Sequence, residues 1–192
     1  MQIERTIKGV TALGPGSRMV VWVNGCHRGC EGCVSKRLQA SAPQNEKDVT
    51  QYFNDFSLFG VDGITVSGGE PFNQIDGLYE LVKYMVEKRV LDILIYTGYT
   101  IEELLAKNDE RIDYILKNIA VLIDGPYVDA LNDNKGNLKG STNQRVIVLN
   151  EDYRQIYDEY YKSERGMQEF LFGNFLVAVG IPTKEYIESF TK

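Results

Sequence analysis

The residues best suited to chemistry in this chain are three cysteines that lie within eight consecutive positions. Cys26, Cys30 and Cys33 are the only cysteines, and the single histidine, His27, follows the first of them. An odd number of cysteines at such tight spacing does not make a disulfide framework. Thiolates grouped in this way are instead typical ligands of zinc or of an iron–sulfur cluster in a reducing compartment.

The number of available ligands favours a cluster over a zinc ion. A structural zinc site needs four closed ligands, whereas this chain offers three thiolates and a histidine that is directly adjacent to Cys26. Three thiolates can hold three irons of a cubane cluster and leave the fourth iron open to a substrate, as catalytic zinc sites leave one position open. A zinc site and three buried thiols without any ligand are the alternatives.

The elements that position the cysteines begin with a continuous apolar run over residues 19–23, typical of a strand buried on both faces. Asn24-Gly25 ends this strand and starts the cysteine loop. Thr100 and Glu103 predict a capping box. Similar apolar runs predict further strands, and apolar residues at helical spacing predict helices between them: strands at 63–66, 91–96, 119–123 and 145–149, and helices near 49–56, 75–86, 112–116 and 153–160.

This alternation predicts an α/β fold with a mostly parallel sheet, because each parallel crossover needs a helix. Five such strands cannot close an eight-stranded barrel. We therefore expect an open, partial βα barrel of about five to six mostly parallel strands, or a doubly wound sheet, with the cysteine loop after the first strand.

The end of the chain predicts a small addition to this fold. Gly173-Asn174 separates two apolar runs and predicts a hairpin, followed by a short helix to Lys192. We expect residues 1–192 to form a single domain, with 150–192 as a C-terminal extension. The loop over residues 131–143 is rich in Asn, Asp, Gly and Lys and is expected to be exposed and mobile.

Polar and glycine residues follow each predicted strand, where α/β proteins build their sites. These candidate residues are Gly68, Gly69, Glu70, Thr97 and Asp124. Bare glycine backbone lets a ligand approach and offers N–H donors, the Thr97 hydroxyl can reach a ribose, and Asp124 can bind ribose or a partner. The alternatives are ordinary turns and caps at the same positions.

Composition excludes several classes of function. The net charge of −6 argues against a general nucleic-acid surface, which needs a basic face. No apolar run approaches the roughly 20 residues of a membrane span, and the first residues do not resemble a signal peptide. We therefore expect a cytoplasmic protein without a nucleic-acid or membrane partner.

The motif Cys26-x3-Cys30-x2-Cys33 after a buried strand resembles the radical S-adenosylmethionine superfamily. The closer resemblance is to the activating proteins of anaerobic ribonucleoside-triphosphate reductase, over roughly residues 1–149. It rests on five motifs in the same order: residues 13–33, 67–71, 96–100, 124–127 and 140–145.

This resemblance implies a cofactor set. Cys26, Cys30 and Cys33 would bind one 4Fe–4S cluster, whose open iron chelates the amino and carboxylate groups of S-adenosylmethionine. Residues 68–70 would contact the methionine part, with Glu70 near its ammonium group. His27 would only shield the cluster.

The resemblance also implies a reaction and its partners. One electron from the cluster, received from a small reductant protein such as flavodoxin or ferredoxin, would cleave S-adenosylmethionine. The resulting deoxyadenosyl radical would take a hydrogen atom from a glycine of a glycyl radical enzyme, here anaerobic ribonucleotide reductase.

One position departs from the superfamily pattern. Many members have an aromatic residue before the third cysteine that stacks on adenine, and this chain has Gly32. Glycine there is compatible with the reductase-activating group. The other functions considered are a radical enzyme acting on another glycyl radical enzyme, a peptide or a small molecule, and a non-catalytic metal-binding or electron-relay protein.

Overall fold

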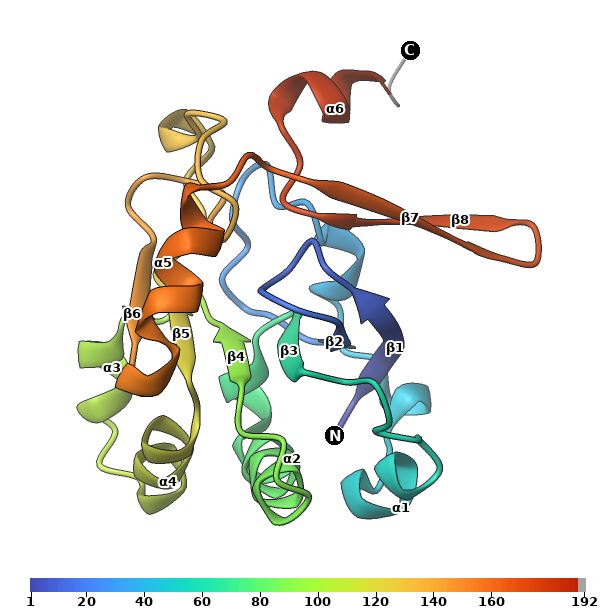
Figure 1. Cartoon of the computed structure of the whole chain (residues 1–192), viewed down its shortest axis with the longest axis vertical. Helices are drawn as coiled ribbons and strands as arrows, with labels where there is room; N and C mark the ends of the chain where they lie inside the picture. The colour runs from blue at the N-terminus through green and yellow to red at the C-terminus, as the bar shows by residue number, and fades with distance from the viewer. Residues whose placement is uncertain (190–192) are drawn as a thin grey trace.

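A six-stranded sheet forms the centre of the computed structural model, which describes residues 1–189 (Figure 1). The strands lie in chain order: β1 (Ile3–Val10), β2 (Arg18–Val23), β3 (Gly63–Gly68), β4 (Ile93–Tyr96), β5 (Val121–Asp124) and β6 (Arg145–Val148). Neighbouring strands from β2 to β5 are parallel, and β1 and β6 are antiparallel at the two edges. The predicted α/β fold with a mostly parallel sheet is therefore confirmed.

Both edge strands differ from the prediction. No strand was predicted over residues 3–10, yet β1 pairs with β2 along its length. The predicted strand near 145–149 exists, but its expected parallel direction is wrong. Between β5 and β6 the chain forms only the short 3₁₀ turn η4 (Asp129–Leu131) and no crossover helix, so β6 returns antiparallel to β5.

Four helices cover one face of the sheet: α1 (Val49–Asn54), α2 (Ile75–Glu87), α3 (Ile101–Leu105) and α4 (Glu110–Asn118). Alternate residues of β2 point to this face, so that Met19, Val21 and Val23 share a core with Phe53 of α1 and Leu81 of α2. Each such fully buried side chain contributes roughly 1.5–3 kcal/mol relative to exposure. Figure 1 shows α1, α2 and α4 side by side below the sheet.

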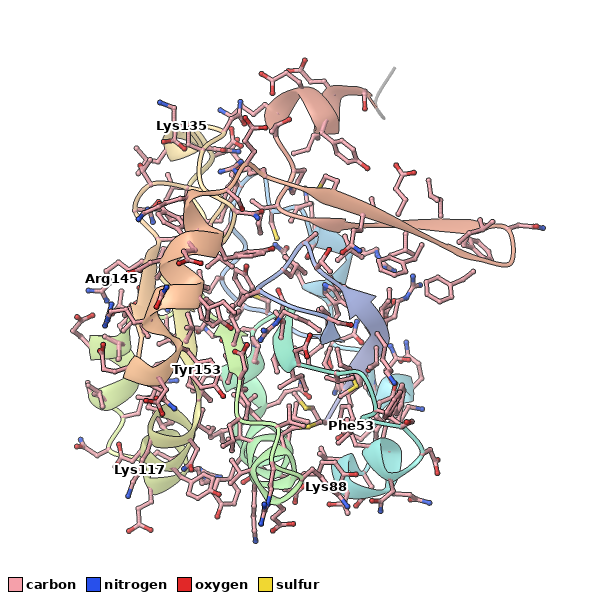
Figure 2. The ribbon with its side chains drawn as sticks, viewed as in Figure 1. Phe53, Lys88, Lys117, Lys135, Arg145 and Tyr153 are labelled. Atoms are coloured by element: carbon pink, nitrogen blue, oxygen red, sulfur yellow. The ribbon has the colours of Figure 1, made fainter. Side chains whose placement is uncertain are left out.

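The start of α3 is set by the local signal that was predicted there. The capping box of α3 is present, because Thr100 Oγ1 accepts from Glu103 N and Glu103 Oε2 accepts from Thr100 N. Lys88, the residue after α2, places its Nζ 5.2 Å from the centroid of the Tyr84 ring, and Figure 2 labels it beside that helix. Short 3₁₀ turns complete the helical elements: η1 (Lys36–Leu38), η2 (Pro43–Asn45), η3 (Pro71–Gln74) and η5 (Glu151–Tyr153).

The C-terminal segment covers the opposite face. Helix α5 (Arg154–Lys162) inserts Tyr157, only 1% exposed, among Leu94 and Val121. The predicted hairpin is confirmed as β7 (Met167–Phe172) and β8 (Phe175–Gly180), and it projects from the body in Figure 1. Helix α6 (Lys184–Ser189) follows, and the rest of the predicted helix to Lys192 lies outside the described residues.

A buried arginine ties four of these elements together. Arg18 of β2 donates from Nε to Thr65 Oγ1 of β3 at 2.6 Å and from Nη1 to Asp92 Oδ2, just before β4, at 2.7 Å. Tyr157 of α5 donates its hydroxyl to the other oxygen of Asp92 at 2.5 Å. The strand that leads to the cysteine loop is thus fixed to its neighbours by buried polar contacts as well as by the sheet.

The loop over residues 131–143, predicted to be exposed, is partly buried. Asn137, Leu138 and Ser141 are 5%, 0% and 1% exposed, so the prediction of exposure is wrong for these residues. The guanidinium of Arg165, after α5, donates to the carbonyl oxygens of the loop and of the segment after the hairpin, which are those of Lys135, Gly136, Lys139, Gly140 and Pro182. One side chain therefore holds the loop against the C-terminal segment.

None of the helices within residues 1–189 has the length and apolar character needed to cross a membrane.

Candidate functional site

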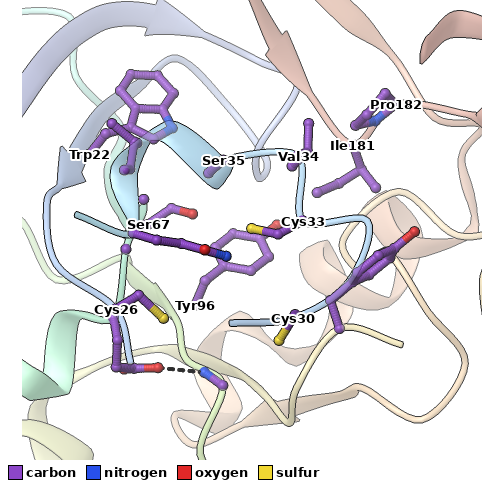
Figure 3. A pocket seen from close by; sticks show the side chains of 18 of the residues that line it. Trp22, Cys26, Cys30, Cys33, Val34, Ser35, Ser67, Tyr96, Ile181 and Pro182 are labelled. Carbon is purple, nitrogen blue, oxygen red and sulfur yellow. Dashed lines mark hydrogen bonds between the residues drawn. The ribbon is translucent and has the colours of Figure 1, made fainter. Parts of the chain in front are cut away.

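A cavity of about 310 Å³ opens at the carboxyl ends of β2, β3 and β4 (Figure 3). The cysteines, residues 68–70 and Thr97 with Gly98 line it, and the fourth predicted strand end, residues 124–127, contributes Gly125 and Tyr127. Its remaining walls include Trp22, Tyr96 and residues 177–182 of the hairpin segment. The parallel sheet thus brings together groups that are far apart in sequence.

The cysteine loop leaves β2 at Gly25, whose φ of +86° suits glycine. Gly25 N donates to Leu38 O and Cys26 N donates to Gln39 O, both at 2.8 Å, so the two ends of the loop meet beside Cys26. All three thiols are partly exposed and free of disulfides, and Figure 3 shows them around the cavity. The loop therefore presents three thiols to one space.

The three free thiols line one cavity, whose fit to an iron–sulfur cluster can be compared with its fit to a single ion. Across residues 1–189, no three His, Cys, Asp or Glu side chains converge on one point as ligands of a single ion. His27 is turned elsewhere, with Nδ1 2.9 Å from Asn73 Nδ2. Thiols spaced around a cavity fit a cluster in which each of three irons takes one thiolate. Burial raises the pKa of the Cys26 thiol, and metal ligation would supply the positive charge that stabilises its thiolate.

The glycines after β3 allow this strand end to lie against the cysteine loop. Gly69 N donates to Val23 O at 2.7 Å, and Glu70 N donates to Gly25 O at 2.8 Å. A Cβ on Gly69 would lie 2.5 Å from Gly25 O, and one on Gly68, at a φ of +109°, would lie 2.5 Å from Val23 N. Glycine is therefore required at both positions by the close approach of backbone.

Glu70 joins the ends of β3 and β4. Its side chain is buried, and it accepts from Thr97 Oγ1 at 2.8 Å, from Gly98 N at 2.7 Å and from Phe72 N at 3.1 Å. Burial raises the pKa of Glu70 although these three donors favour the carboxylate. A buried carboxylate at the cavity wall, near the three cysteines, suits a cationic group of a ligand.

Asp124 lies away from the lining of the cavity. It is fully buried, accepts from Ile101 N at the start of α3 at 2.8 Å, and forms an ion pair with Arg145. Arg145, which Figure 2 places at the edge of the molecule, also pairs with Glu102. Its neighbour Gly125 lines the cavity instead. The role of Asp124 in ribose binding stays a prediction.

The cavity also holds buried polar atoms that have no hydrogen-bond partner. Within residues 1–189, only three buried side-chain polar atoms lack a hydrogen-bond partner: Arg5 Nη1, Arg28 Nε and Tyr96 Oη. All three residues line this cavity. Buried polar atoms are normally paired, so their common location indicates that the cavity receives a polar ligand. Arg5 lies on the strand that was not predicted, whereas Tyr96 ends the third predicted strand, one of the strand ends expected to meet at the site.

Comparison with known proteins agrees with this site. A family model described as a 4Fe-4S single cluster domain matches residues 12–147. The anaerobic ribonucleoside-triphosphate reductase-activating protein of Escherichia coli (strain K12) is 33% identical over 144 residues, which cover 71% of this chain and 91% of that protein. The chain belongs to this family of activating proteins. The activating protein of Salmonella typhimurium is 34% identical over 145 residues, covering 71% of this chain and 91% of that protein, and that of Enterobacteria phage T4 is 32% identical over 142 residues, covering 69% and 85%.

As a radical S-adenosylmethionine activase, this activating protein uses one 4Fe–4S cluster and S-adenosylmethionine. The cavity fits both groups. It offers three thiols for the cluster, a buried carboxylate for an ammonium group, and the unpaired Arg28 Nε and Tyr96 Oη for anionic or polar atoms.

The activating protein has a C-terminal segment outside the matched region. The match takes in 91% of the Escherichia coli protein but only 71% of this chain, and the family model ends at residue 147, before α5. The hairpin that closes one side of the cavity therefore lies beyond the part shared with the family model.

Proposed function

We propose that this activating protein cleaves S-adenosylmethionine reductively and generates a glycyl radical on an anaerobic ribonucleoside-triphosphate reductase. The observation that carries the proposal is the single cavity that collects three thiols, a glycine turn and a buried carboxylate at adjoining strand ends. When bound, the 4Fe–4S cluster supplies the electron that cleaves the S-adenosylmethionine sulfonium. The names of the relatives support the choice of reductase.

The proposed roles of individual residues follow their places in the cavity. Cys26, Cys30 and Cys33 would hold the cluster. Backbone N–H and C=O groups of Gly68 and Gly69 would contact the methionine part, and the Glu70 carboxylate would accept from its ammonium group.

Thr97 and Asp124 are the proposed ribose contacts. The Thr97 hydroxyl also donates to Glu70, so Thr97 would orient this carboxylate at the same time. Asp124 directly precedes Gly125, which lines the cavity. Its proposed contact with the ribose would be made from this strand end, where its carboxylate also accepts from Ile101 N.

The proposal includes the barrel shape, the number of domains, the cellular location and the electron donor of the activating protein. The linear order of six strands, with a parallel centre and the cavity at its carboxyl ends, supports an open, partial βα barrel. The buried Tyr157 supports a single domain in which residues 150–192 extend the shared core. Exposed cluster thiols need a reducing compartment, which supports a cytoplasmic location, and each cleavage needs an external one-electron donor such as flavodoxin or ferredoxin.

The test is anaerobic reconstitution with iron and sulfide, reduction with dithionite, and measurement of deoxyadenosine released from S-adenosylmethionine. We expect deoxyadenosine from the wild-type protein and none from Cys30→Ala. Loaded and reduced wild-type protein that makes no deoxyadenosine would overturn the proposal.

The partner is tested by mixing the reduced protein with the anaerobic reductase and recording electron paramagnetic resonance spectra. A glycyl radical signal on the reductase is expected. Cleavage without this signal would favour another glycyl radical enzyme, a peptide or a small molecule as the substrate.

A further inference from the structure

The β7–β8 hairpin presents an apolar face next to the cavity. Its register pairs Phe172 with Phe175 and Phe170 with Val177, and the two-residue period of strands places these four side chains on one face. Phe170 and Val177 pack against the sheet core. Phe172 and Phe175, toward the tip, are 47% and 76% exposed. The outer half of this face is thus uncovered.

A guanidinium group stands beside the same face. Arg5 of the edge strand β1 lies over the ring of Phe172, with Cζ 5.7 Å from the ring centroid. Its Nη1 is buried and has no hydrogen-bond partner. Leaving a buried charged donor unpaired is costly, so a bound molecule with an acceptor, best a carboxylate, would complete this position.

The hairpin face continues into the cavity. Arg5, Val177, Val179 and Ile181 all line the space that the three cysteines line. Val34 of the cysteine loop is 67% exposed and lies near Ile181 in Figure 3. A continuous surface therefore runs from the hairpin tip, past Arg5, to the cavity that the three cysteines line, where S-adenosylmethionine would be cleaved.

We propose that this surface, Arg5 with the Phe172 and Phe175 face of the hairpin, docks an extended segment of the partner polypeptide that carries a carboxylate next to apolar residues. The carboxylate pairs with Arg5, and the apolar side chains cover Phe172 and Phe175. This inference rests on the proposed function, in which a partner backbone must reach the cavity.

Two arguments favour a partner segment over a second copy of this chain. A second copy seated on the hairpin would cover the approach to the cavity that the substrate has to use. The hairpin also lies outside residues 12–147, the part matched by the family model, so it provides recognition that this chain adds to the shared site.

The test compares affinities for the anaerobic reductase, measured by biolayer interferometry with reconstituted activating protein. Arg5→Gln and Phe175→Ser are each expected to weaken binding about tenfold or more, equal to about 1.4 kcal/mol. Phe59→Ser is the matched control, because Phe59 is 91% exposed and does not line the cavity. It should leave the affinity unchanged.

A second measurement separates docking from chemistry. Phe175→Ser should retain the iron content and the partner-independent release of deoxyadenosine of the wild-type protein. For Arg5→Gln, the affinity for S-adenosylmethionine is measured as well, and a loss there with unchanged affinity for the reductase would overturn the assignment of Arg5.

The remaining outcomes are equally decisive. Unchanged affinity of both variants for the reductase would overturn the docking surface while leaving the proposed function intact. A dimer of the wild-type protein that Phe175→Ser dissociates, without a change in reductase affinity, would show that a second copy covers the hairpin. If the wild-type protein cleaves no S-adenosylmethionine, the proposed function itself fails.

Discussion

Replacing Arg18 by methionine should destabilise the protein strongly, although Arg18 is not part of the cavity lining. Arg18 is fully buried and donates to Thr65 Oγ1, to Asp92, and to the carbonyls of Pro15 and Ile64. Arg18→Met keeps the length of the side chain but removes every donor. The carboxylate of Asp92, a residue that is 6% exposed, then keeps one side-chain partner within residues 1–189, the Tyr157 hydroxyl.

The expected size follows from removing one partner of a buried ion pair, which costs about 3–5 kcal/mol. For a chain of this length each kcal/mol lowers the melting temperature by about 2–4 °C, so we expect a fall of about 6–20 °C. Urea denaturation of the reduced apo-protein, followed by circular dichroism, measures the free energy of unfolding directly.

A double-mutant cycle separates the ion pair from simple loss of packing. Asp92→Asn in the Arg18→Met background removes the stranded charge and should recover about half of the lost stability, roughly 2 kcal/mol. The Asp92→Asn single variant completes the cycle and gives the coupling free energy between the two side chains. Arg154→Met is the control, since the exposed Arg154–Glu151 pair should contribute little. A loss below about 1 kcal/mol for Arg18→Met, or additive effects in the cycle, would refute this reasoning.

Three further predictions concern the site. Cys30→Ala should abolish iron and sulfide incorporation, measured by elemental analysis, while leaving the apo-protein folded, because the thiol forms no disulfide; full iron content would contradict its role as a ligand. Gly69→Ala should lower stability by about 1–3 kcal/mol and impair cluster incorporation, because its Cβ would lie 2.5 Å from Gly25 O, whereas Gly166→Ala, whose Cβ would meet no atom within 4 Å, should be tolerated. Glu70→Gln should reduce the pH dependence of the free energy of unfolding. Burial raises the pKa of Glu70 in the folded protein. The stabilisation that the protonated carboxyl provides is therefore fully present below the unfolded pKa of about 4.3 and is lost as the pH rises through the folded pKa. Denaturation of the apo-protein from pH 4 to 8 should therefore show that the free energy of unfolding falls less in Glu70→Gln than in the wild type. The same dependence of this free energy on pH in both proteins would contradict a raised pKa of Glu70.

The predictions that the structure confirms rest on local signals. The buried runs of β2 to β5, the capping box at Thr100 and the hairpin turn at Gly173 are each encoded within a few residues. The convergence of the cysteine loop with residues 68–70 and Thr97 followed from a general property of parallel sheets.

The features that were missed depend on residues distant in sequence. The strand β1 contains Glu4, Arg5 and Lys8 and lacks a continuous apolar run, so its pairing with β2 stabilises it rather than its own pattern. The direction of β6 depends on the absence of a crossover helix before it. Two of the donors to Glu70, Thr97 Oγ1 and Gly98 N, come from the end of β4 and are brought to it only by the fold.

The contacts of Arg165 determine how far the chain can be shortened. The family model ends at residue 147, which suggests a compact catalytic unit cut near residue 150. Such a cut would remove Tyr157 from the core and Arg165 from the carbonyls of Gly136 and Lys139, leaving that loop, a neighbour of the cavity, without its anchor. A chain that ends after Gly166 would keep both side chains, but it would lose Phe170 and Val177 from the sheet core and residues 177–182 from the cavity wall. A minimal unit should therefore extend at least to Pro182, whose carbonyl also accepts from Arg165.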